Sequence, residues 1–175
     1  MSLFGTEIRY GLVAQGLHWL TAGLVLGAWL IAGTWRGGSS SLLTLHQTLG
    51  FAVLVMVVVR LAWRWFDRRP ATPPMPGVMA FASKVAHWLL YALLLAVPAT
   101  AIAGSWLEGH AITVYGIGAI GPFLTTSRSL GHEILDIHEF LGSAIMWVAG
   151  FHAAAAIFHH VFLRDRVLKQ MLPVG

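Results

Sequence analysis

Four long apolar segments dominate the hydrophobic pattern, at residues 12–34, 42–66, 85–107 and 137–163. Each contains a charge-free run of 18 residues or more. As a helix rising about 1.5 Å per residue, each can cross the hydrocarbon core of a membrane, which is about 30 Å thick. No stretch alternates polar and apolar positions over ten residues, as membrane β-strands do. The pattern predicts an all-α integral membrane protein, a four-helix up-down bundle forming a single domain over residues 1–175.

Composition narrows the class of protein further. Hydrophobic residues make up 57% of the chain and charged residues 10%, against about 45–50% and 25% in soluble domains. The chain has no cysteine, which excludes disulfides, thiolate metal sites and covalently attached c-type haem. The lysines and arginines flank the apolar segments and form no basic stripe, so no nucleic-acid partner is expected. The lipid bilayer is the predicted environment.

The placement of positive charge predicts the orientation of the spans. Four spans put both termini on one side, which then carries nine of the 11 lysines and arginines. The other side has only Arg36 and Arg128. By the positive-inside rule, both termini lie in the cytoplasm. Prolines at 70, 73, 74 and 76 predict a stiff linker between the second and third spans, and the glycine-rich stretch 108–133 is expected to fold over the outer mouth.

An internal repeat singles out two histidines. The second span opens with LHQTLGFAV around His46, and the fourth with IHEFLGSAI around His138. Both spans run inward, so the two histidines are expected at one depth near the outer surface. Gly50 and Gly142 follow one turn deeper on the same helix faces, where a flat ligand needs a missing side chain. Polar helix starts with packing glycines are the simpler explanation, but a matched pair favours a shared ligand.

A second group of histidines is predicted near the cytoplasmic side. His152 follows His138 by 14 residues, about 21 Å deeper and within about 40° of the same helix face. Its partner is either His18 or His87, which open similar HWL motifs, and spacing favours His18 only modestly. Arg60 follows His46 by the same 14 residues. Arg60 is therefore a candidate partner for the carboxylates of a buried prosthetic group, which would be propionates if that group is haem, or else an arginine that reaches the headgroups.

Paired histidines at two depths fit haem iron better than other ligands. Zinc needs three or four ligands in one cluster, and a proton relay needs no flanking glycines. Two b-type haems, each held between two imidazoles, would carry electrons across the bilayer. A transporter is the other class considered, but the repeat is parallel and the inverted repeats of transporters are missing.

These motifs, with FHAAAA at 151–156 followed by His159 and His160, resemble the bacterial dihaem cytochrome b561 family over essentially the whole chain. The resemblance implies a multi-pass protein of the bacterial inner membrane with two non-covalent haem b groups. It implies His46 and His138 as axial ligands of the outer haem iron. It implies His18 and His152 as ligands of the inner one, which resolves the choice against His87.

The resemblance also implies ubiquinone as a substrate beside the inner haem. His159 lies two turns past His152 on nearly the same helix face, where an imidazole can exchange a proton with a quinone. Lys84 and Arg64 are further candidates for this site, or else serve only as topology signals.

The sequence is compatible with two functions. Stand-alone family members include a superoxide:ubiquinone oxidoreductase, and the C-terminal stretch from Arg164 to Pro173 is similar to that type. Superoxide capture favours a positive outer mouth, yet this outer side has more acidic than basic residues. The alternative is a haem-bearing relay or anchor that serves a periplasmic redox partner and has no substrate of its own. Whether the chain is an enzyme and its oligomeric state stay undetermined by the sequence.

Overall fold

The computed structural model describes residues 4, 6, 9–34, 40–67 and 76–172. Most of these residues belong to four long helices. A two-stranded hairpin joins the third helix to the fourth, and the fourth ends in a π-helical turn. The elements in chain order are α1 (Leu12–Thr34), α2 (Ser40–Phe66), α3 (Gly77–Leu107), β1 (Ile112–Val114), β2 (Gly118–Ile120), α4 (Arg128–Phe158), η1 (His159–Leu163) and η2 (Leu168–Gln170).

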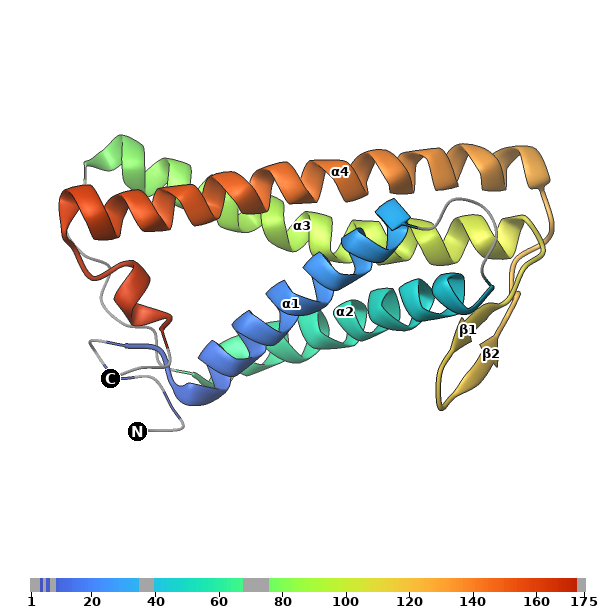
Figure 1. Ribbon diagram of the computed structural model, residues 1–175, viewed down its shortest axis with the longest axis horizontal. Helices are drawn as coiled ribbons and strands as arrows, with labels where there is room; N and C mark the ends of the chain where they lie inside the picture. The colour runs from blue at the N-terminus through green and yellow to red at the C-terminus, as the bar shows by residue number, and fades with distance from the viewer. Residues whose placement is uncertain (1–3, 5, 7–8, 35–39, 68–75, 173–175) are drawn as a thin grey trace.

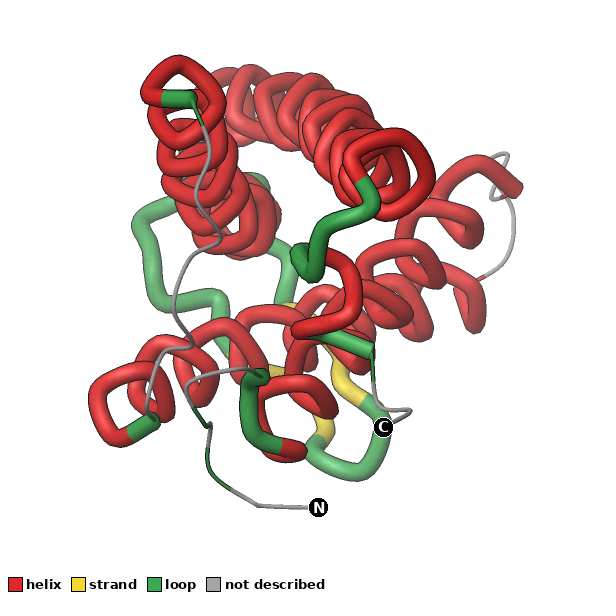
Figure 2. The backbone as a smooth tube through the Cα atoms, turned by 90° about the vertical axis from the view of Figure 1, so that its left-hand side faces the viewer, coloured by secondary structure: helices red, strands yellow, loops and turns green. Residues whose placement is uncertain are grey.

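Successive helices run in opposite directions, and both chain ends lie at the same end of the molecule (Figure 1). We call this the terminal end; the opposite end, which carries β1 and β2, is the hairpin end. Helix α1 packs on α2, α3 packs on α4, and α2 also contacts α3. Viewed along the bundle, the helices form two pairs (Figure 2). The predicted all-α four-helix bundle is confirmed, whereas the side of the membrane that each end faces stays a prediction.

Close packing is concentrated in a short section midway along the bundle. Ile145 of α4 belongs to this section and lies seven residues from both His138 and His152. Val57 of α2 is fully buried there. The section therefore separates the histidines of the two ends with apolar side chains. Its buried residues are Val53, Val57, Leu93, Leu94 and Ile145.

The outer surface of the helices is strongly apolar. Trp65, Trp88, Phe140 and Trp147 are each more than 70% exposed. Soluble monomers rarely expose contiguous apolar surface on this scale. All four long helices are long and apolar enough to cross a membrane. The chain is therefore a multi-pass membrane protein whose exposed apolar side chains suit contact with lipid.

Two helices begin earlier than the hydropathy pattern predicts. Helix α3 starts at Gly77 instead of residue 85, and α4 starts at Arg128 instead of residue 137. A helix satisfies its own backbone hydrogen bonds in water as well as in lipid, so it does not have to stop at the membrane surface. Hydropathy marks the segment that lipid covers, and the helix continues through the flanking polar residues. The predicted proline linker falls mainly on residues 68–75, outside the described part of the chain.

The glycine-rich connection contains a β-hairpin that the sequence pattern did not predict. Strands β1 and β2 are antiparallel, with Ile112 opposite Ile120. Ile112 and Val114 point inward and are buried. The Thr113 N–H donates to Gln47 Oε1 and the Tyr115 N–H to Thr48 Oγ1, both at 3.0 Å. These bonds tie the hairpin to the first turns of α2, so this connection does fold over one end of the bundle.

Candidate haem sites and the terminal-end histidines

The two histidines of the internal repeat meet at the hairpin end. The rings of His46 on α2 and His138 on α4 lie with centroids 6.1 Å apart and planes at 83°. Both residues are half-buried. They come from helices of different pairs, so the space between the two helix pairs lies between the imidazoles. The structure thus brings together the two residues predicted for the outer site.

Hydrogen bonds fix which nitrogen of each ring carries the proton. Nδ1 of His46 lies 3.0 Å from the Ala28 carbonyl oxygen of α1. Nδ1 of His138 lies 2.8 Å from the Val97 carbonyl oxygen of α3. A carbonyl can only accept, so both Nδ1 atoms donate and both Nε2 atoms keep a lone pair. Such a bond to a neighbouring backbone is how metal-binding histidines are usually oriented.

The glycines beneath these histidines leave room beside them. A Cβ atom built on Gly50 or Gly142 meets no atom within 4 Å, although both residues are half-buried. Gly131 in the first turn of α4 is different, because a Cβ there would lie 2.9 Å from the Gly104 carbonyl oxygen. Gly131 and Gly104 therefore serve close packing of α3 on α4. Gly50 and Gly142 border open space, which fits a flat macrocycle held between the two imidazoles.

Three histidines and an arginine gather toward the terminal end. The rings of His87 and His152 lie with centroids 5.2 Å apart and planes at 80°, much like the pair at the hairpin end. His18 lies close enough to both to interact with them electrostatically. The structure therefore brings both candidate partners, His18 and His87, to His152.

The two candidate partners differ in their hydrogen bonds and exposure. A guanidinium only donates, so Nδ1 of His18 accepts a bond from Arg60 at 3.1 Å, and the proton of the neutral ring sits on Nε2. Nδ1 of His87 donates to the Ser83 carbonyl oxygen at 2.6 Å, within its own helix. His87 is exposed on α3, whereas His18 is half-buried. For Nε2 of His18 to bind a metal, Arg60 must release Nδ1.

Tyr91 is a member of this group that the sequence did not single out. Its ring lies near two cations, with the guanidinium carbons of Arg60 and Arg64 each 5.6 Å from the ring centroid. Arg64 also donates to the Tyr91 hydroxyl at 3.3 Å. Only the spacing of the arginines, one turn apart on α2, hinted at a common partner. These contacts and the hydrogen bond to His18 hold the Arg60 guanidinium at the level of His18.

The three quinone-site candidates have different surroundings. Arg64 is engaged with Tyr91, and Lys84 lies exposed on α3, three residues before His87. His159 begins the π-helical turn η1, and its Nδ1 lies 2.5 Å from Asp165 Oδ2. Partial burial raises the pKa of Asp165, but hydrogen bonds from His159 and from the Val167 N–H outweigh it and hold that pKa below its usual value. Asp165 is therefore an anion at neutral pH.

The hairpin-end surface carries an acidic residue between two histidines. Glu108 lies 3.5 Å from His110 and 3.9 Å from His132, and both histidine side chains are about three-quarters exposed. Within the described ranges, no three His, Asp or Glu side chains converge in a way that could hold a metal ion. This cluster is therefore a charged surface feature, and the histidine pairs inside the bundle remain the candidate sites.

Comparisons with known proteins match this arrangement to one family. The sequence model of prokaryotic cytochrome b561 matches residues 9–174. A probable superoxide oxidase CybB of Yersinia pestis is 29% identical over 94% of this chain and 96% of its own. Cytochrome b561 homolog 1 of Escherichia coli K12 is 30% identical over 90% and 93% of the two chains. Homolog 2 of the same organism is 27% identical over 98% and 95%.

The family match covers all four membrane helices and both histidine groups. Four lipid-facing helices and converging imidazoles are what a membrane cytochrome of this kind requires. The chain therefore belongs to the prokaryotic cytochrome b561 family, and it transfers electrons across a bacterial membrane by means of b-type haem.

Proposed function

We propose that the protein carries electrons through two haem b groups between a donor at the hairpin end and ubiquinone at the terminal end. The observation that carries this proposal is the His46–His138 pair, with a lone pair left on both Nε2 atoms and open space beside Gly50 and Gly142. His46 and His138 would hold one haem, and His18 and His152 the other. Bound haem supplies a one-electron carrier whose iron is closed to oxygen by its two imidazoles.

The choice of His18 over His87 rests on burial and charge as well as on family resemblance. His18 is half-buried next to Arg60, whereas His87 is exposed and bonded within its own helix. An arginine beside an axial histidine can pair with a haem propionate. To form that pair, Arg60 would break its hydrogen bond to His18. Nδ1 of His18 could then carry the proton, which frees Nε2 for iron.

We further propose that the terminal end faces the cytoplasm and that the membrane is the bacterial inner membrane. Arg9, Arg64, Lys84, Arg166 and Lys169 all belong to the terminal end or its flanking segments. Positive charge concentrated at one end of the spans marks the cytoplasmic side. The hairpin end, with Glu108 and its two histidines, would then face the periplasm.

The space around Gly142 gives a test of the outer haem. Gly142→Leu places a side chain in the open space one turn from His138, and we expect the haem content to fall from two per chain toward one. Gly150→Leu is the matched control, because Gly150 is exposed on the same helix with nothing near its Cβ position. Pyridine haemochrome assays on both variants would measure the haem content. Equal haem in the two variants would argue against a macrocycle beside Gly142.

His159 is proposed as the proton donor to ubiquinone, with Lys84 and Arg64 as lesser candidates for the same site. It lies about 10 Å beyond His152 along the fourth helix, toward the terminal end. His159→Ala should leave both haem spectra intact and slow haem oxidation by a ubiquinone analogue roughly a hundredfold, the low end of general acid–base catalysis. Stopped-flow absorbance of the prereduced protein would measure this rate. An unchanged rate would remove His159 from the site.

Superoxide is the proposed donor at the hairpin end, supported by the similarity to a probable superoxide oxidase. The test is a pulse of superoxide given to the oxidised protein, followed by stopped-flow absorbance with and without ubiquinone. Fast appearance of reduced haem bands, reversed by the quinone, is the expected result. Haem that ignores superoxide but accepts electrons from quinol would contradict this donor.

A protein donor is the second candidate, and the charge at the hairpin end favours it. Glu108 directly follows α3 at this end, and Glu133 and Glu139 lie in α4 near its start. An acidic surface attracts a basic redox partner and repels a small anion such as superoxide. Reduction of the haems by a basic periplasmic protein, with a rate that falls steeply as salt rises, would favour this alternative.

A further inference from the structure

A carboxylate at the end of the fourth helix is positioned by an unusual piece of backbone. Helix α4 changes to the π-helical turn η1 at His159, and Arg164 then adopts a left-handed conformation with φ 52°. The Asp165 N–H donates back to the His159 carbonyl oxygen at 3.2 Å. In a continuous helix, position 165 would point about 120° away from position 159. The reversal at Arg164 brings the Asp165 carboxylate onto the His159 ring instead.

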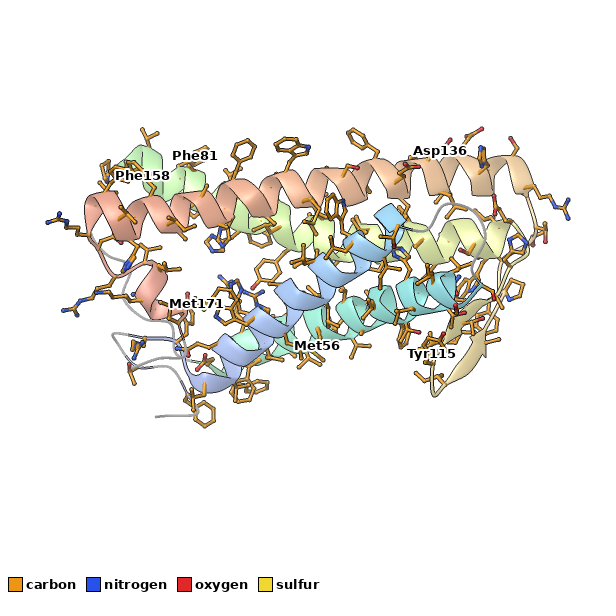
Figure 3. The ribbon with its side chains drawn as sticks, in the orientation of Figure 1. Met56, Phe81, Tyr115, Asp136, Phe158 and Met171 are labelled. Carbon is orange, nitrogen blue, oxygen red and sulfur yellow. The ribbon has the colours of Figure 1, made fainter. Side chains whose placement is uncertain are left out.

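Both oxygens of this carboxylate are used. Oδ2 accepts from His159 Nδ1, and Oδ1 accepts from the Val167 N–H at 3.0 Å. The side chain of His159 is 15% exposed and that of Asp165 is 24% exposed, so the pair sits at the boundary between the bundle and solvent. The chain after Asp165 is also tied to the bundle, because Trp19 Nε1 of α1 donates to the Met171 carbonyl oxygen at 2.8 Å. Met171 lies beside the start of α1 (Figure 3).

The arrangement determines what the imidazole can do. With Nδ1–H directed at an anion, neutral His159 keeps its lone pair on Nε2, and the carboxylate stabilises the imidazolium when Nε2 gains a proton. Strained backbone and π-helical turns recur at functional sites because they aim a side chain that a regular helix cannot. A purely structural cap would need only the Val167 bond.

We propose that Asp165 is a positioning residue, which holds the His159 ring oriented so that its Nε2 can deliver a proton to bound quinone. The proposal rests on the quinone role of His159 given above. Quinone reduction takes two electrons from the haems and two protons. In one transfer the Nε2–H bond breaks and an O–H bond forms on the reduced quinone, while Nδ1 of His159 keeps its proton and still donates it to the Asp165 carboxylate. His159 regains its proton from cytoplasmic water, and the second proton comes from solvent.

Asp165→Asn is the direct test, because the amide oxygen can still accept from Val167 while the negative charge is lost. The prereduced holoprotein is mixed with a ubiquinone analogue over a range of concentrations. We expect the limiting rate of haem oxidation to fall about tenfold, less than the roughly hundredfold loss expected without His159, because the imidazole itself is still present. The half-saturating quinone concentration should change little. Asp165→Glu should restore most of the rate. Asp136→Asn is the matched control, on the exposed surface at the hairpin end (Figure 3).

A double variant separates positioning from stability. If Asp165 acts through His159, then His159→Ala with Asp165→Asn is no slower than His159→Ala alone. Additive losses would overturn the proposal, as would an Asp165→Asn rate equal to that of the control. If Asp165→Asn lowers the melting temperature, Asp165→Ser, whose hydroxyl can also accept from Val167, takes its place. A wild-type protein that exchanges no electrons with quinone would defeat the proposed function itself, whereas a slow His159→Ala beside a normal Asp165→Asn defeats this inference alone.

Discussion

Replacing His138 with alanine is expected to remove the haem at the hairpin end and to leave the other haem in place. His138 and His46 approach each other across the two helix pairs, and each keeps a lone pair on its Nε2. Loss of one axial imidazole leaves the macrocycle with half of its protein ligands, so the haem content should fall from two per chain to about one. His46→Ala should give the same result. Haem assays with redox titration of each variant would measure which component disappears.

His132→Ala is the control for this pair. His132 lies on α4 at the same end. Its side chain is exposed, and its ring lies 3.9 Å from the Glu108 carboxylate instead of facing another histidine of the bundle interior. Its removal should leave both haems. The structural cost of His138→Ala is small, because the lost bond to the Val97 carbonyl is worth about 1 kcal/mol. A His138→Ala protein that keeps both haems would exclude His138 as a ligand.

Replacing His152 with alanine is expected to remove the other haem, again reducing the content to about one per chain. His152 is the residue that both candidate partners approach at the terminal end. The haem that remains should be the one that His138→Ala removes. Difference spectra of the two variants, added together, should therefore reproduce the spectrum of the unaltered protein.

The partner of His152 is decided by two further variants. His18→Ala should lose the same haem as His152→Ala, and His87→Ala should keep both. The opposite result would assign the ligand to His87, whose ring lies 5.2 Å from that of His152 in the structure. The hydrogen bond from Arg60 to His18 would then belong to the functional protein, and His18 would serve as the partner of Arg60 instead of as an iron ligand.

Much of the fold could be predicted because the membrane imposes it. An apolar run of sufficient length must be a helix, since lipid offers its backbone no hydrogen bonds. The first span, residues 12–34, agrees with α1 at both ends. The early starts of α3 and α4 could not be predicted in this way, since Gly77 and Arg128 lie where water can satisfy the backbone. The sequence did not predict the β-hairpin because the alternation of apolar and polar residues from Ile112 to Val114 is too short to indicate a strand.

The candidate sites also divide into residues that the sequence predicts and residues that only the folded structure reveals. His46 and His138 were predicted from a repeat, because two helices with the same direction place equivalent residues at the same depth. The relation of His18 to His87 depends on how α1 and α3 are rotated about their axes, which residue spacing does not fix. Asp165 was missed for another reason. Its approach to His159 depends on the left-handed backbone at Arg164, and a non-glycine residue gives no sequence signal for that conformation.

The most direct test of the account is the haem content of the purified, unaltered protein, measured together with an optical redox titration. We expect two non-covalent haem b groups per chain, which titrate as two components and show low-spin spectra typical of paired imidazoles. One haem per chain, or a high-spin spectrum with an open axial position, would contradict the two-site arrangement.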